Sequence, residues 1–87
     1  MGINIQNVNT NDLSRIHELN HGAVPAVSRV TQKELAHFLE IADYFRVIKI
    51  ENNIIGFLIA LTPRKNYHSP NYKWFEKHYT QFMYVDR

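Results

Sequence analysis

The sequence predicts an α+β domain in which an antiparallel sheet of three or four strands carries two helices on one face. Two observations support this fold class. A helix-start signature occupies residues 31–34, and two apolar stretches, 44–51 and 54–61, flank a pair of asparagines as in a β-hairpin. The expected order of elements is β-α-α-β-β-(α)-β. A chain of 87 residues is long enough for one small domain with a single thin core.

The N-terminal part predicts one strand and one helix. Apolar residues in 3–8 indicate a short strand, and those in 13–20 recur at helical spacing. Asn9 or Thr10 can cap this helix, because their side-chain oxygens accept hydrogen bonds from the first free backbone N–H groups. Gly22 is expected to end it, and a connecting loop follows.

The second helix has the strongest signature. Thr31 and Glu34 form a capping box, in which each side chain accepts a hydrogen bond from the other residue's backbone N–H. Val30 before the cap can pack on the first apolar residue after the box. One apolar face is then expected along the helix, made of Leu35, Phe38, Leu39 and Ala42.

The middle of the chain predicts a hairpin. Residues 44–51 are rich in β-branched and aromatic side chains, and Asn52-Asn53 is a plausible two-residue turn. Residues 54–61 form the partner strand, with Gly56 marking a bulge or a close backbone approach. Because it alternates with apolar residues, Lys49 is expected on the outward face.

The C-terminal part predicts a loop, a short helix and a last strand. Pro63 and Pro70 lie in a loop over 62–72. Residues 71–79 suggest a helix with Trp74 and Phe75 turned inward. Residues 81–87 have the composition of a final strand.

Composition narrows the function classes. The net charge is only +2 and the basic residues are scattered, so no nucleic-acid partner is expected. The absence of cysteine excludes disulfides, thiolate metal sites and a cysteine nucleophile. No signal peptide is visible, and the longest apolar run, 54–61, is far shorter than a spanning helix. We therefore expect a soluble cytoplasmic protein without a membrane partner.

Six stretches together carry a family resemblance: Leu19-Asn20, Val24-Pro25-Ala26-Val27-Ser28, Tyr44-Phe45-Arg46-Val47, residues 55–61, Ser69-Pro70-Asn71-Tyr72-x-Trp74-Phe75 and Tyr84-Val85-Asp86-Arg87. In this order they resemble the N-terminal half of GNAT-type N-acetyltransferases, with the closest likeness to a group of predicted bacterial acetyltransferases. The resemblance covers residues 1–87, which we expect to form a single GNAT-like N-terminal half-domain.

The resemblance breaks at the family's cofactor motif. In GNAT enzymes an Arg/Gln-x-x-Gly-x-Gly/Ala loop follows the fourth strand and holds the pyrophosphate of acetyl-coenzyme A. The chain's only glycines, Gly2, Gly22 and Gly56, are far apart. The sequence therefore predicts a half-domain truncated before this motif, with no cofactor of its own, that acts as a non-catalytic binding or interaction module. The alternative is part of an acetyltransferase whose cofactor-binding half is supplied by another chain or lost by truncation.

The family's acceptor-substrate pocket, unlike its cofactor motif, has matching segments in this sequence. The resemblance implies that the loop 21–29 shapes a substrate pocket and that the segment 67–75 lines the same side. Tyr84 and Asp86 fall on the strand that often supplies a water-relayed general base. Packing in the core or an interface is the competing interpretation for the aromatics, and a solvated carboxylate near the chain end is the favoured one for Asp86. The ligand-side candidates are Asn20, Val24, Ser28, Tyr67, Tyr72, Trp74, Tyr84 and Asp86.

A second motif competes with this interpretation. Residues 17–21 match H-E-x-x-H, which on a helix places two imidazoles on one face to bind zinc and would make the chain a zinc hydrolase. However, His21 falls where its helix is expected to close, and no third ligand is identifiable by spacing. His17 and His21 are therefore only weak metal candidates, and surface histidines are the preferred interpretation.

The sequence also predicts a homodimer. Strand 54–61 is apolar on both faces, whereas two helices can cover only one. The uncovered apolar face and the open edge of 81–87 both favour pairing of two copies, either by packing the faces together or by joining the edges into one continuous sheet. The residues expected near this contact are Phe57, Ile59, Phe82 and Tyr84.

Overall fold

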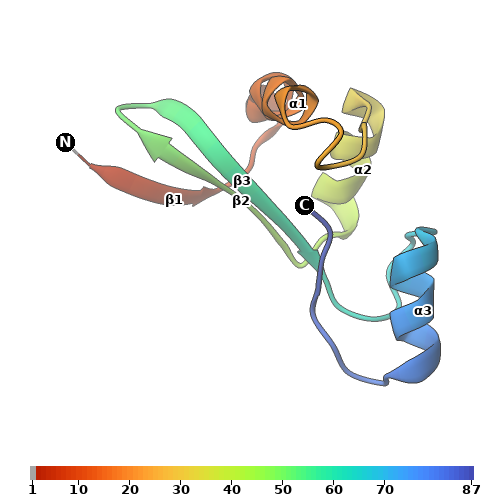
Figure 1. Cartoon of the computed structure of the whole chain (residues 1–87). Helices are drawn as coiled ribbons and strands as arrows, with labels where there is room; N and C mark the ends of the chain where they lie inside the picture. Colours follow the sequence, from red (N-terminus) through yellow and green to blue (C-terminus); the bar gives the residue numbers. More distant parts are fainter. Residues whose placement is uncertain (1) are drawn as a thin grey trace.

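The computed structural model describes residues 2–87 and has the predicted α+β architecture (Figure 1). Over this range one antiparallel sheet has the order β1-β2-β3-β4. The strands are β1 (Ile3–Asn7), β2 (Tyr44–Ile50), β3 (Asn53–Leu61) and β4 (Tyr84–Val85). The helices are α1 (Leu13–Gly22), preceded by the 3-10 turn η1 (Thr10–Asp12), then α2 (Gln32–Ile41) and α3 (Pro70–His78).

Helices α1 and α2 cover one face of the sheet, as predicted (Figure 1). The two central strands turn alternate side chains toward these helices, which places their apolar residues in the core. Both helices and both central strands contribute fully buried residues: Ile16, Leu35, Val47, Ile59 and Leu61. The core therefore lies between the α1–α2 layer and strands β2 and β3.

The capping box at the start of α2 is confirmed. The Thr31 hydroxyl accepts a hydrogen bond from the Glu34 N–H at 3.0 Å, and the Glu34 carboxylate accepts one from the Thr31 N–H at 3.0 Å. Leu35 and Phe38 are buried on the inner face of the helix. The first turn of α2 is thus held by two reciprocal bonds, which matters because this turn borders the cavity described below.

The hairpin turn lies one residue earlier than predicted. Ile50 pairs with Asn53, so the two central residues are Glu51 and Asn52 rather than Asn52-Asn53. Their φ angles are 50° and 66°, the positive values that a tight hairpin turn matching the strand twist requires. Asn53 is already the first residue of β3.

The irregularity expected at Gly56 is present beside it. Ile48 pairs with Gly56 but Lys49 pairs with Ile54, which leaves Ile55 as the extra residue of a bulge. The prediction that Lys49 points outward was wrong. Its ammonium lies 3.4 Å from the carboxylate of Asp12, and only 17% of its side chain is exposed. The buried Asp12 at the start of α1 draws this side chain to the helix-covered face.

The C-terminal segment differs from prediction in two respects. Trp74 and Phe75 are 50% and 36% exposed, so they are not turned inward. Tyr72 takes the inward position instead and is fully buried, with its hydroxyl donating to the carbonyl of Thr62. Strand β4 has two residues rather than the seven of 81–87, although the Asp86 N–H still donates to the Ile59 carbonyl at 2.9 Å.

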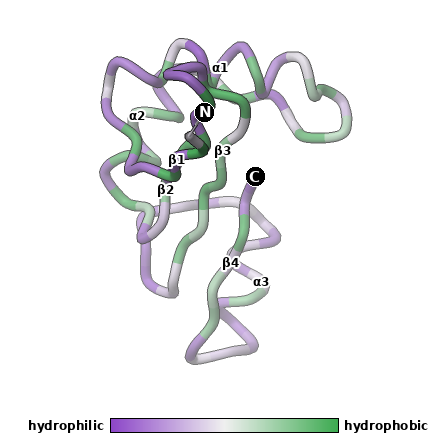
Figure 2. The backbone as a smooth tube through the Cα atoms, turned by 90° about the vertical axis from the view of Figure 1, so that its left-hand side faces the viewer, coloured by the Kyte–Doolittle hydropathy of each residue, from purple (hydrophilic) through white to green (hydrophobic). Residues whose placement is uncertain are grey.

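The opposite face of the sheet carries no helix of the 2–87 range. Ile3 and Ile5 are 70% and 60% exposed there, and Ile5 pairs with the exposed Ile48. Ile59, expected near a dimer contact, is instead fully buried in the chain's own core, and Phe57, Phe82 and Tyr84 are partly buried against it. Figure 2 shows hydrophobic stretches along the strands. In residues 2–87 no helix is long and apolar enough to cross a membrane.

Candidate functional site

A cavity of about 580 Å³ opens between α2 and two loops. Ser28 and Arg29 of the α1–α2 loop form one wall, and one face of α2 from Lys33 to Phe38 forms the next. Residues 66–69 of the β3–α3 loop and the side chain of Arg87 complete it. This volume is within the range of small-molecule sites, which is roughly 300–1,000 Å³.

The floor of the cavity is aromatic. Phe38 is 3% exposed, and its ring centroid lies 5.0 Å from that of Tyr67. Tyr67 in turn meets the fully buried Tyr72 edge-on, with the ring centroids 5.4 Å apart. Because Phe38 and Tyr72 are buried in the core, their packing fixes the position of the Tyr67 ring.

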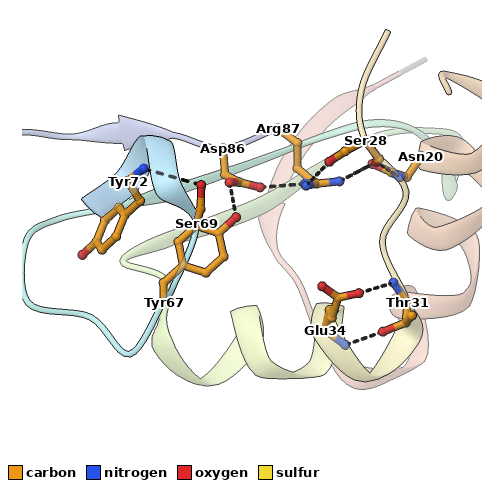
Figure 3. A network of polar contacts seen from close by, with 9 residues as sticks. All are labelled: Asn20, Ser28, Thr31, Glu34, Tyr67, Ser69, Tyr72, Asp86 and Arg87. Atoms are coloured by element: carbon orange, nitrogen blue, oxygen red, sulfur yellow. Dashed lines mark hydrogen bonds and ion pairs between the residues drawn. The ribbon is translucent and has the colours of Figure 1, made fainter. Parts of the chain in front are cut away.

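Arg87 ties the cavity wall together (Figure 3). Its guanidinium donates to the carbonyl of Ser28 at 2.9 Å, to the hydroxyl of Ser28 at 2.9 Å and to the side-chain oxygen of Asn20 at 3.1 Å. The amide of Asn20 also donates to the Ser28 carbonyl at 3.0 Å. Two hydrogen bonds therefore fix the α1–α2 loop to the C-terminal segment, one joins that segment to α1, and one joins α1 to the loop.

Asp86 closes the other end of this network (Figure 3). One carboxylate oxygen accepts from the guanidinium of Arg87 at 2.7 Å, and the other accepts from the Tyr67 hydroxyl. Only 4% of the side chain is exposed, so the favoured interpretation of a solvated carboxylate was wrong. Burial, together with the hydrogen bond to this carboxylate, raises the pKa of Tyr67 well above its usual range. Tyr67 thus remains a hydroxyl donor.

Asn66 of the β3–α3 loop is contacted by one histidine of α2 and by one histidine of its own loop. His37 Nε2 lies 2.7 Å from the backbone carbonyl of Asn66, and His68 Nε2 lies 3.1 Å from the Asn66 side-chain oxygen. Since both partners are acceptors, each imidazole donates through Nε2. The mouth of the cavity is therefore fixed by polar contacts from both sides of Asn66.

The far end of the same loop is held by carboxylates. Asp43 accepts from the N–H and the hydroxyl of Thr62 at 2.7 and 2.8 Å and pairs with Lys65 at 3.2 Å. Burial acts to raise the pKa of Asp43, but these bonds outweigh it and leave the pKa below its ordinary value. Glu76 accepts from the N–H of Arg64 at 2.8 Å, and this bond lowers the pKa of Glu76. These contacts position the loop without lining the cavity.

The sequence candidates divide into two groups. Ser28 and Tyr67 line the cavity. Asn20 and Asp86 lie directly behind its wall and contact it through Arg87. The others are outside its lining: Val24, Tyr72, Trp74 and Tyr84. The ring of Trp74 stacks on that of His78 with the centroids 4.1 Å apart, and the ring of Tyr84 meets that of Tyr72 edge-on with the centroids 5.6 Å apart.

Sequence reasoning missed most of the polar lining. Arg87 was quoted only as part of a family resemblance, and Lys33 was an unassigned position of the capping box. Their roles depend on contacts with distant parts of the chain, for which the sequence carries no local pattern. The two histidines of the H-E-x-x-H motif, His17 and His21, lie on α1 and do not line the cavity. Within residues 2–87 no cluster of three or more His, Cys, Asp or Glu is positioned to hold a metal ion.

The described residues do not fit the pyrophosphate of acetyl-coenzyme A. Gly22 ends α1 and Gly56 lies within β3, so neither stands at the start of a helix. Where backbone donors open an element, side chains already accept from them, as at Asn9 and Thr31. The acidic partners in these caps, Asp12 and Glu34, would also repel a pyrophosphate.

Comparison of the chain with models of protein families, with curated proteins and with solved structures finds no match. The resemblance to GNAT-type enzymes therefore depends on the stretches quoted in the sequence analysis. The cavity, by contrast, follows from the geometry of the described residues alone.

Proposed function

We propose that this chain is a binding module, derived from the acceptor side of a GNAT-type fold, that holds a small molecule between α2 and the β3–α3 loop. The observation that carries the proposal is the cavity of about 580 Å³ with its aromatic floor and fixed polar walls. Its volume, apolar base and few convergent polar groups are typical of small-molecule sites.

The position of the cavity supports the link to the family. The resemblance implies that loop 21–29 and segment 67–75 shape an acceptor pocket, and Ser28, Arg29 and Tyr67 from these segments line the cavity. The walls are held before any ligand arrives, by Arg87 on one side and by the α2 capping box on the other. Such preorganisation lowers the entropic cost of binding.

The site favours binding of a ligand over catalysis of a reaction. A general base needs a free carboxylate oxygen within reach of the substrate. Both oxygens of Asp86 already accept hydrogen bonds, and the side chain is almost fully buried. The alternative, a part of an acetyltransferase completed by another chain, is supported only by the sequence resemblance.

Backbone NMR tests the proposal directly. A ¹⁵N-labelled sample is screened against a library of small polar and amphipathic compounds, and we expect hits to shift amides in 28–38 and 66–69. His68→Trp, at the cavity mouth, should abolish these shifts, whereas His21→Trp on the exposed end of α1 should retain them. Hits that bind both variants equally would contradict the proposed site. Calorimetric titration with acetyl-coenzyme A distinguishes the binding module from the alternative, a part of an acetyltransferase. Micromolar binding to the chain alone would favour the acetyltransferase.

We also propose that two copies associate through the uncovered sheet face. Support comes from Ile3, Ile5, Ile48 and Leu58, which are exposed on that face at 70%, 60%, 37% and 40%. Side chains of this size and exposure, close together on paired strands, are uncommon on soluble monomers. A two-fold arrangement is the simplest form of such a contact.

A further inference from the structure

We infer that the cavity selects an anionic small molecule with an apolar body, such as an aromatic carboxylate. This inference deepens the proposed function and rests on it. The proposed function states only that the cavity binds a ligand. The charges and the floor of the cavity identify which chemical class the ligand belongs to.

The charged groups lining the cavity leave an excess of positive charge. Arg29 and Lys33 have no ion-pair partner within residues 2–87. The third cation, Arg87, is neutralised by Asp86. Glu34 is the one carboxylate of the lining, and it accepts the Thr31 N–H at the start of α2. Two cations thus face one carboxylate that is already held by a hydrogen bond.

The backbone next to each of the two cations is held by contacts of the fold. Arg29 directly follows Ser28, whose carbonyl and hydroxyl are both bound by Arg87. Lys33 lies in the first turn of α2, inside the Thr31–Glu34 capping box. The backbone positions of the two cations are therefore held by neighbouring contacts, which lowers the entropic cost of placing an anion between their side chains.

The floor sets the body of the ligand. Tyr67 presents aromatic surface, and the buried Phe38 lies behind it with the ring centroids 5.0 Å apart and the planes tilted by 57°. An aromatic ring of a ligand packs favourably on such a pair by offset or edge-to-face contact. A cationic ligand would be repelled by Arg29 and Lys33. A ligand with a strongly polar body would lose hydration over the aromatic floor without gaining hydrogen bonds there.

Three related probes test the inference: 3-phenylpropanoate, its isostere 3-phenylpropanamide, and 3-phenylpropylamine. They share the phenyl group and the chain length but differ in charge. We expect the carboxylate to shift amides in 28–38 and 66–69, with an affinity roughly five- to tenfold above that of the amide. The amine should bind more weakly than the amide. Added salt should weaken binding of the carboxylate alone.

Charge-removal variants locate the selectivity. Arg29→Gln and Lys33→Gln should each lower the affinity for 3-phenylpropanoate several-fold more than they lower the affinity for the amide. Lys77→Gln, which removes an exposed cation in the last turn of α3, is the matched control and should change neither. Unchanged spectra away from the cavity verify that each variant is folded.

The outcomes distinguish this inference from the proposed function. Equal affinity of all three probes at the cavity amides would overturn the anion preference and leave the binding proposal standing. Probes that shift no cavity amide, while hits from the compound library still do, would overturn this inference alone, whereas a folded chain without any hit at the cavity would overturn both. Carboxylate binding that survives Arg29→Gln and Lys33→Gln unchanged would also overturn the assignment of these cations.

Discussion

Replacing Arg87 by methionine should destabilise the domain by leaving a buried negative charge. Arg87→Met retains the length of the side chain but removes its donors to Asp86, Ser28 and Asn20. The Asp86 carboxylate, with 4% of its side chain exposed, would then have only the Tyr67 hydroxyl as a side-chain donor.

The magnitude follows from the cost of an unpaired buried charge. Breaking a buried ion pair from one side costs about 3–5 kcal/mol. Because Tyr67 still donates to Asp86, we expect the low end, about 3 kcal/mol. For a domain of this size each kcal/mol shifts the melting temperature by roughly 4–8 °C, so a fall of roughly 12–24 °C is expected.

Two further variants sharpen the test. Asp86→Asn in the Arg87→Met background removes the unpaired charge and leaves an oxygen to accept from Tyr67, so the double variant should be more stable than Arg87→Met alone. Arg15→Met is the matched control, because the Arg15–Glu18 pair is exposed and should contribute well under ~1 kcal/mol. Chemical denaturation followed by circular dichroism measures all four proteins. A cost below about 1 kcal/mol for Arg87→Met, or no rescue by Asp86→Asn, would refute the reasoning.

Three other predictions follow from particular contacts. Thr31→Ala removes the cap of α2 and should cost about 1 kcal/mol in denaturation experiments, whereas Thr31→Ser should cost little. The pKa of Asp43 is lowered in the folded state, so the contribution of its carboxylate to the free energy of unfolding is complete above the ordinary pKa of 3.8. That contribution is lost as the pH falls through the folded-state pKa. Asp43→Asn should therefore reduce the fall in melting temperature between neutral and acidic pH. Light scattering should show a dimer for the natural chain and a monomer for Ile5→Lys; a monomer of the natural chain at high concentration would contradict self-association through the sheet face.

Sequence reasoning succeeded where the signal was local. The capping box at Thr31 and Glu34 needs only residues three apart, and it was predicted correctly. The order of strands and helices followed from hydrophobic periodicity and turn residues in the same way. The hairpin turn was shifted by one residue because Asn52 and Asn53 both tolerate turn geometry, and pairing of Ile50 with Asn53 decided between them.

Long-range contacts could not be predicted in this way. The inward face of α3 was assigned to Trp74 and Phe75 because size and apolarity favour burial. The structure buries Tyr72 instead, since its hydroxyl reaches the carbonyl of Thr62. Likewise, the contacts between Arg87 and Ser28 join residues 59 positions apart, and the two stretches that contain these residues give no indication that they meet.

The link from Arg87 to the α1–α2 loop has a consequence for the order of events during synthesis. A ribosome releases the chain from its N-terminus, so α2 and the β2–β3 hairpin, which depend on nearby residues, can form first. The wall at Ser28 gains its anchor only once residue 87 has emerged, because the donors come from that side chain. At the proposed binding site, Ser28 would therefore become fixed only after α2 and the β2–β3 hairpin can already have formed.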